Sequence, residues 1–211
     1  MQIIQICPKS FASNTYLLIS GSSAFVIDPS VSVDAIIDSV KKFNASLEGI
    51  LLTHGHFDHI FSIDTLRERL NIPVYIHSAD APMLTDGKIN GSYTLFQREF
   101  FHKPADLFLE DGQKISLGNE QIEVLHTPGH SKGSCCFIIP TDEHGIAVIT
   151  GDTLFSDSVG RCDLYGGSHK ELAASIKKLY RFDKSALIYP GHNNITTLGN
   201  ALDCTAYFFD F

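Results

Sequence analysis

The chain has 211 residues, of which 44% are hydrophobic, so it can bury a sizeable core. Its 16 basic and 24 acidic residues give a formal net charge of −8, which argues against a nucleic-acid partner and, without a cluster of lysine and arginine, against a membrane surface. Five cysteines form no Cys-x-x-Cys pair, the first residues do not resemble an export signal, and no apolar run approaches the length of a membrane span. We therefore expect one cytoplasmic domain over residues 1–211.

The first part of the chain alternates short apolar runs with helical spacing, which is typical of a β-α-β arrangement. Turn residues after position 20 favour a hairpin between the second and third strands. The predicted strands are residues 2–7, 14–20, 24–27, 49–53 and 73–76. The predicted helices are residues 32–43, which Ser32 can cap, and residues 58–70.

The second part is rich in strands, and we expect it to build a second sheet. Residues 85–104 carry several aromatic side chains, which could form a wall or lid beside a cavity or could pack beneath a long connection. Ser168 can cap a helix that ends at Leu179. The predicted strands are residues 106–109, 113–117, 120–126, 134–139, 145–150 and 186–189.

Four metal-binding side chains lie within six residues, directly after the apolar strand 49–53: His54, His56, Asp58 and His59. Imidazole nitrogens and carboxylate oxygens suit zinc, iron or manganese, and both histidines of a His-x-His sequence at a strand end point to one side. A turn at the intervening glycine lets the last two residues face the same cavity and serve a second ion. The alternative is a pair of solvated loop histidines, but imidazoles this dense rarely serve packing alone.

Further candidate ligands follow other predicted strands. His130 lies in a glycine-rich turn, Asp152 follows strand 145–150 and could bridge two cations, and His192 comes directly after the last strand. Asp28 ends the strand before Pro29, where it can support the site from behind or simply occupy a turn. The sequence thus predicts a metal site assembled from the ends of several strands.

In this order, these residues resemble the metallo-β-lactamase superfamily over nearly the whole chain. The sequences Thr-Pro-Gly-His130, Gly-Asp152-Thr-Leu-Phe and Tyr-Pro-Gly-His192 are most similar to the glyoxalase II (hydroxyacylglutathione hydrolase) branch. The resemblance implies an α/β fold, a four-layer αββα sandwich. It also implies the ligands: His54, His56 and His130 for one metal, Asp58, His59 and His192 for the other, Asp152 as the bridge, and Asp28 behind them.

The activity that this resemblance implies is hydrolysis of a small-molecule acyl thioester. The nucleophile would be hydroxide held between two divalent transition-metal ions, zinc above all, with iron or manganese as alternatives. Asp58 would also orient the attacking water. Arg161, in the segment Gly160–Asp163, is predicted to hold a substrate carboxylate through its planar guanidinium, unless it is tied to a neighbouring aspartate to shape the loop.

Two departures from the longer glyoxalase II proteins leave other functions open. Only residues 193–211 follow His192, so the helical extension that helps those proteins hold glutathione is not expected here. The Gly-Arg-x-Asp segment is also similar to that of persulfide dioxygenases, which use a single iron with ligands that match His54, His130 and Asp152. A mononuclear iron dioxygenase is therefore one alternative, and a metal-stabilised binding domain without turnover is another. The sequence does not indicate the oligomeric state.

Overall fold

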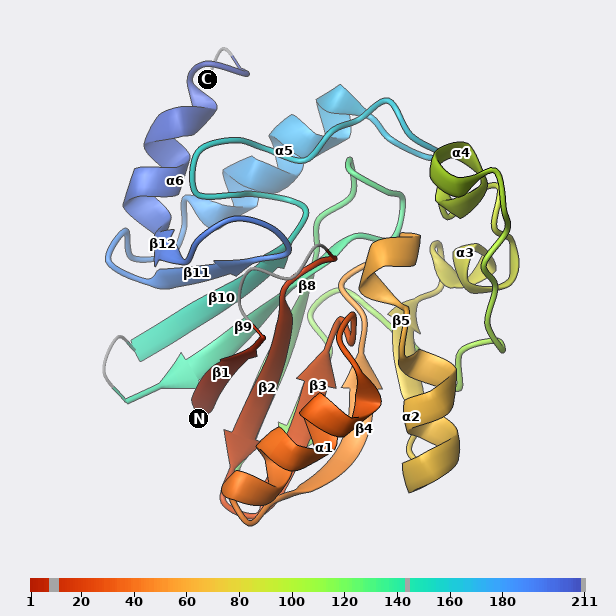
Figure 1. The fold of residues 1–211 in the computed structure, drawn as a ribbon. Coiled ribbons are helices and arrows are strands. Elements are labelled where there is room, and N and C mark those ends of the chain that lie inside the picture. Colours follow the sequence, from red (N-terminus) through yellow and green to blue (C-terminus); the bar gives the residue numbers. More distant parts are fainter. Residues whose placement is uncertain (8–11, 143–144, 210–211) are drawn as a thin grey trace.

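Two six-stranded β-sheets lie face to face at the centre of the molecule, and helices cover the outer face of each (Figure 1). The structure is a computed structural model that describes residues 1–7, 12–142 and 145–209. Helices α1 and α2 lie beside the first sheet, and α5 and α6 lie beside the second (Figure 1). The predicted four-layer α/β sandwich is confirmed.

The first sheet has the strand order β1-β2-β3-β4-β5-β6. Gly21, at a φ of 60°, makes the turn of the predicted hairpin between β2 and β3, and β3 to β6 run parallel. The bounds are β1 (Gln2–Ile6), β2 (Thr15–Ser20), β3 (Ser23–Ile27), β4 (Ser46–Leu51), β5 (Val74–His77) and β6 (Leu107–Leu109).

The expectation that residues 106–109 belong to the second sheet is wrong. Strand β6 pairs in parallel with β5, and Asp106 fixes this pairing because its carboxylate accepts a hydrogen bond from the backbone N–H of Val74, at 2.8 Å. A three-residue apolar run carries no information on which sheet edge it joins, so only the tertiary structure reveals the pairing.

The second sheet has the order β12-β11-β10-β9-β8-β7, antiparallel except between β10 and β11. Helix α5 lies in the connection between these two parallel strands, as a parallel pair requires. The bounds are β7 (Lys114–Leu117), β8 (Glu120–His126), β9 (Cys135–Thr141), β10 (Gly145–Gly151), β11 (Leu187–Pro190) and β12 (Thr196–Thr197).

Serine caps begin two helices as predicted: the hydroxyls of Ser32 and Ser168 accept hydrogen bonds from backbone N–H groups in the first turns of α1 and α5. The helix expected over residues 58–70 is shorter, because residues 57–59 form a separate 3₁₀ turn, η1, that carries candidate ligands. Three short helices, α3, α4 and α6, were not expected. The bounds are α1 (Val33–Lys42), η1 (Phe57–His59), α2 (Ile63–Leu70), α3 (Ala81–Thr85), α4 (Ser92–Phe96), α5 (His169–Leu179) and α6 (Leu198–Thr205).

Three layers of buried apolar side chains hold the sandwich together. One lies between the first sheet and helices α1 and α2, one between the two sheets, and one between the second sheet and helices α5 and α6. The alternation along β2 shows the division, since Leu17 faces the helices while Leu18 faces the second sheet. None of the helices in the described part of the chain is long and apolar enough to cross a lipid bilayer.

Candidate metal centre

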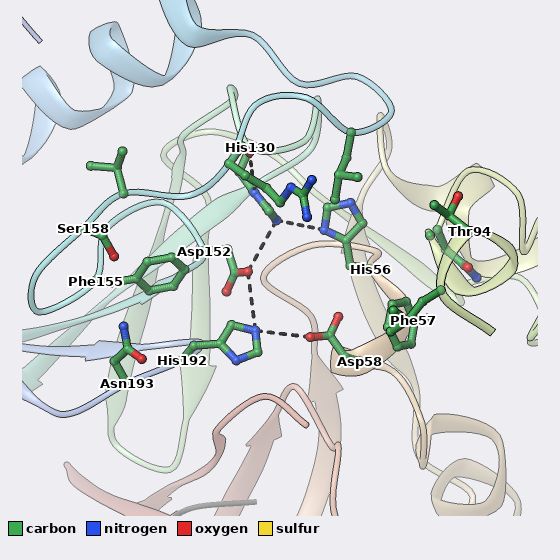
Figure 2. Close-up of a pocket in the computed structure, with 16 residues that line it drawn as sticks. His56, Phe57, Asp58, Thr94, His130, Asp152, Phe155, Ser158, His192 and Asn193 are labelled. Carbon is green, nitrogen blue, oxygen red and sulfur yellow. Dashed lines mark hydrogen bonds and ion pairs between the residues drawn. The ribbon is translucent and has the colours of Figure 1, made fainter. Parts of the chain in front are cut away.

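The seven predicted ligands come together at the end of the sandwich where the strands that precede them stop. Figure 2 shows those that line the cleft, namely His56, Asp58, His130, Asp152 and His192. The first sheet supplies four of them just after β4, from His54 to His59, and the second sheet supplies one each after β8, β10 and β11. Strands far apart in the sequence therefore bring His130, Asp152 and His192 to the first group.

Three buried histidines form the first potential ligand group: His54, His56 and His130. Nδ1 of His56 lies 2.8 Å from Nε2 of His130, so two imidazole nitrogens face each other and need a proton or a cation between them. Nδ1 of His54 lies 3.0 Å from the hydroxyl of Thr53, which leaves Nε2 free to face the cleft. The three histidines of the predicted triad lie close enough together that they could hold one metal ion.

The second group consists of Asp58, His59 and His192, whose ligand atoms lie within 4.8 Å of one another. Nε2 of His192 is 3.2 Å from Oδ2 of Asp58, and Nε2 of His59 is 4.0 Å from the same oxygen. Asp58 and His192 are partly exposed, so this group lies at the open side of the cleft.

Asp152 lies between the two groups. Its Oδ1 is 3.4 Å from Nε2 of His59, and its Oδ2 is 3.4 Å from His130 and 3.6 Å from His192 (Figure 2). The close approach depends on Gly191, because a Cβ there would collide with Oδ1 of Asp152. The Asp152 carboxylate is therefore within reach of both ligand groups, and a carboxylate can bridge two cations.

The side chains of the cleft fit metal ions better than they fit one another. Nε2 of His54 and of His59, and Oδ1 of Asp152, are buried without a hydrogen-bond partner among the described residues, which is costly unless a cation takes their lone pairs. Burial and neighbouring histidines hold the pKa of His54 well below its usual range and lower that of His56 to about 3, so both imidazoles are neutral and able to coordinate. The clusters are compatible with two metal ions.

The structure places Asp28 directly behind this centre. Its Oδ2 lies 2.8 Å from Nδ1 of His59 and accepts a hydrogen bond from the hydroxyl of Thr53 at 2.6 Å, while Oδ1 accepts one from the Thr53 backbone N–H at 2.8 Å. Asp28 has a φ of 48°, an unusual value for a residue other than glycine, so the backbone is held in a strained conformation to make these contacts. With Nδ1 so engaged, His59 directs Nε2 into the cleft. Although burial opposes protonation of His59, the carboxylates of Asp152 and Asp28 outweigh it and raise its pKa, so a metal ion that binds Nε2 would displace a proton from it.

Arg161 lines the cleft, but its side chain is already engaged. The exposed guanidinium makes a two-pronged contact with Asp163, with Nε and Nη2 each 2.7 Å from a carboxylate oxygen. This is the loop-shaping arrangement that the sequence left open beside the substrate role. The backbone contributes as well: the carbonyl oxygen of Arg161 lies 2.9 Å from Nδ1 of His130 and can accept a hydrogen bond from Nδ1–H, which would leave Nε2 unprotonated toward the cleft.

A buried carboxylate, Asp80, braces the site and was missed by the sequence analysis. It follows β5, and its oxygens accept hydrogen bonds from the backbone N–H of Gly55 at 3.2 Å, the hydroxyl of Ser131 at 2.6 Å and the backbone N–H of Gly133 at 2.6 Å. Asp80 thereby joins the segment that carries His54 and His56 to the loop that carries His130. Burial raises its pKa despite these bonds. A lone aspartate in a turn has no sequence signal that separates a brace from an ordinary turn residue.

The ligands open onto a cavity of about 520 Å³. Phe57 and Thr94 lie on one side of it, and Phe155, Ser158 and Asn193 lie on the other (Figure 2). A cavity of this size suits a small organic substrate. Four residues of the 85–104 connection line this cavity, namely Asn90, Gly91, Thr94 and Leu95. None of the aromatic residues of the connection, which the structure describes throughout, is among them, and the rings of Phe96 and Phe100 instead contact each other, with centroids 5.4 Å apart, so the expected aromatic wall is not what lines the cavity.

Comparison with known proteins identifies the family to which this chain is similar. The family model described as "Metallo-beta-lactamase superfamily" matches residues 9–192. The protein named "Probable metallo-hydrolase YqgX" from Bacillus subtilis (strain 168) is 38% identical over 181 residues, which are 85% of this chain and 84% of that protein.

Solved structures share the same fold. The B3 metallo-beta-lactamase BLEG-1 is 35% identical, with a TM-score of 0.89 and coverage of 99% of this chain and all of that one. TTHA1623, solved in a di-iron-bound form, is 33% identical, with a TM-score of 0.76 and coverage of 95% and 96%. ETHE1 from Myxococcus xanthus is 25% identical, with a TM-score of 0.74 and coverage of 94% and 80%.

Proposed function

The chain belongs to the metallo-beta-lactamase superfamily, as its motif order predicts, and we propose that it hydrolyses small-molecule acyl thioesters at a site for two divalent metal ions. The observation that carries the proposal is the arrangement of two ligand groups on either side of Asp152, with unpartnered buried nitrogens facing the space between them. The similarity to a protein named as a metallo-hydrolase supports an enzyme, and a neighbour solved with two irons supports two ions.

Each ion would have its own ligands from this chain. We assign His54, His56 and His130 to one ion, Asp58, His59 and His192 to the other, and Asp152 to both. Bound there, the ions would polarise a substrate carbonyl and lower the pKa of a water molecule toward neutrality. Zinc suits this mixture of imidazole and carboxylate ligands, as do iron and manganese.

The role we assign to Asp58 follows from its charge and position. Burial opposes its ionisation, but His59 and His192 outweigh that effect and lower its pKa, so the carboxylate is ionised at neutral pH. It is partly exposed at the cleft, where it can accept a hydrogen bond from a water molecule and direct the water's lone pair toward the substrate. No serine or cysteine nucleophile is required by this scheme.

A substrate carboxylate remains a candidate partner for Arg161. Because Asp163 already occupies both prongs of the guanidinium, such a carboxylate would have to replace Asp163 rather than meet a free cation. Replacing Asp163 would cost little free energy, because the Arg161–Asp163 pair is exposed and exposed ion pairs are weak.

A mononuclear iron dioxygenase is the second candidate, favoured by the similarity to ETHE1 over most of both chains. It would use His54, His130 and Asp152 and leave the group around Asp58 without a metal. Hydrolysis is the better proposal, because Asp58, His59 and His192 form a compact group that a single-ion enzyme would not need.

One experiment separates these candidates. The protein is purified without chelator, its metals are counted by elemental analysis, and thiol release is followed with S-lactoylglutathione and with uncharged acyl thioesters. Oxygen uptake with glutathione persulfide is measured in parallel, and a β-lactam is included because one structural neighbour is named as a B3 metallo-beta-lactamase. Two ions with thioester hydrolysis support the proposal. One iron with persulfide-dependent oxygen uptake, or turnover of the β-lactam alone, overturns it.

A further inference from the structure

The cavity beside the metal centre has an apolar lining that the metal chemistry does not need. Its apolar side chains are Phe57 and Leu95 on one side and Phe155, Val159 and Leu164 from the segment after β10. Figure 2 shows Phe57 and Phe155 on opposite sides of the cleft, with Asp58, Asp152 and His192 between them. A ligand whose carbonyl reached the centre would therefore lie between two apolar walls.

The wall on the side of Phe57 is held firmly. The Phe57 ring meets the ring of Phe96 in α4 edge to face, with centroids 5.4 Å apart, and the Phe57 backbone N–H donates to the carbonyl of Asn90 at 3.1 Å. Asn90 is fully buried, and its side-chain amide donates to the carbonyls of Met83 and Phe100. These contacts fix Asn90 and Phe96, on either side of Leu95, so this side of the cavity is well ordered by its own packing.

Leu95 itself is 59% exposed at the mouth of this cavity. A single exposed leucine needs no explanation, but this one shares a concave surface with four other apolar side chains, where a ligand could cover it. Polar side chains also line the cavity, but the amide of Asn90 is bonded to the carbonyls of Met83 and Phe100, and that of Asn193 to Asp157. Arg161 is the only lysine or arginine among the described residues that line the cavity, and Asp163 occupies it.

From this lining we infer that the substrate carries an apolar chain of several carbons, and that Leu95 helps to select it. That the substrate is a thioester rests on the proposed function. The apolar chain of the substrate lies between the side of the cavity that holds Phe57 and Leu95 and the segment that carries Phe155 and Val159. The thioester carbonyl faces the candidate metal ligands. The chain could belong to the acyl group or to the thiol, and both placements use the same apolar contacts.

Two substrate series distinguish these placements. In the first, the acyl group of neutral N-acetylcysteamine thioesters is lengthened from acetyl to octanoyl; in the second, the acyl group stays acetyl and an alkyl thiol is lengthened. We expect kcat/KM of the metal-loaded enzyme to rise by about threefold per methylene along one series until the chain fills the cavity. Leu95→Ser should reduce the gain for the longer chains about fivefold to tenfold. Leu107→Ser is the matched control, because Leu107 is an exposed leucine on β6 that does not line the cavity.

A binding measurement tests the inference without turnover. Calorimetric titration with non-hydrolysable S-alkyl thioethers of N-acetylcysteamine should show tighter binding and a more negative heat-capacity change with chain length, weakened in Leu95→Ser and unchanged in Leu107→Ser. Length-dependent binding without hydrolysis of any thioester would support the apolar site and overturn the proposed function. Hydrolysis and binding that ignore chain length, or that respond equally in both variants, would overturn the apolar site alone. If Leu95→Ser melts at a lower temperature than the wild type, the milder Leu95→Ala variant decides in its place.

Discussion

Replacement of Asp80 by asparagine tests whether this brace holds the two metal-binding loops together. In the wild type, Oδ1 accepts from Gly133, and Oδ2 accepts from both Gly55 and Ser131. The asparagine oxygen can keep the bond to Gly133. The amide nitrogen that replaces Oδ2 points a donor at the N–H of Gly55, whereas the hydroxyl of Ser131 can rotate, because it also contacts Ser134 at 2.6 Å.

The structure therefore predicts one lost hydrogen bond in Asp80→Asn, at a buried backbone donor that finds no other acceptor. Such a loss costs about 1–3 kcal/mol of unfolding free energy, or a melting temperature lower by about 2–10 °C for a chain of this size. Alanine would leave the backbone N–H groups of both Gly55 and Gly133 without an acceptor and should cost about 2–6 kcal/mol. Because the brace sets the distance from His54 and His56 to His130, we also expect affinity for the ion held by these histidines to fall by about 10–100-fold.

Thermal unfolding should be measured both with chelator and with metal, since a bound ion stabilises the folded state on its own. Metal affinity is then obtained by competition with a chromophoric chelator. Asp183→Asn is a matched control: Asp183 is exposed and accepts a turn hydrogen bond from the backbone of Ser185 at 2.8 Å, away from the cleft. Unchanged metal affinity in Asp80→Asn, whatever happens to its melting temperature, would refute the positioning role.

Elemental analysis of protein purified without chelator should find close to two transition-metal ions per chain, and one ion under metal excess would contradict the two-site assignment. Asp58→Asn should lower hydrolysis by at least about a hundredfold with the fold intact, whereas near-normal turnover at full metal occupancy would exclude Asp58 from the chemistry. In a carboxyl NMR titration, Asp163 should titrate at a pKa of about 2, because Arg161 stabilises its charged form; the pair then contributes stability above pH 3.8 and loses it as the pH falls through about 2. In Arg161→Ala this pKa should rise toward 3.8, and KM should rise by the equivalent of up to about 1 kcal/mol for a carboxylate-bearing thioester but hardly change for an uncharged one.

The convergence of the ligands could be predicted from the sequence because each ligand follows a strand whose apolar character is local. His54 and His56 come three and five residues after the buried end of β4 at Leu51, and His192 comes two residues after the end of β11 at Pro190, so the strand end largely fixes where each side chain emerges. The order of these motifs then indicated the fold. Local patterns were sufficient here because a predicted strand already indicates where the residues that follow it lie.

Other features depend on tertiary contacts that no local pattern encodes. The pairing of β6 with β5 is set by three residues and the side chain of Asp106. Arg161 could be assigned to substrate or to the loop from the sequence, and only the geometry shows that Asp163 occupies it. Asp80 acts through partners 25 and 53 residues away, so its importance lies in the packing of three loops.

The two halves of the metal centre come from different sheets, so their spacing depends on contacts that cross from one sheet to the other. The backbone of Cys135 at the start of β9 donates to the carbonyl of Thr53 at 2.8 Å, next to the first histidine. On the opposite side, the hydroxyl of Tyr16 in β2 donates to the carbonyl of Pro190 at 2.7 Å, and the side chain of Asn14 donates to the same carbonyl at 2.9 Å, two residues before the last histidine. Because these bonds, like those of Asp80, lie outside the ligand set, the protein can hold its ligands near one another before any ion binds. The free energy of folding then offsets the repulsion between the carboxylates and imidazole lone pairs of the metal centre. An ion binds more tightly as a result, because the ligands do not have to be brought together when it binds.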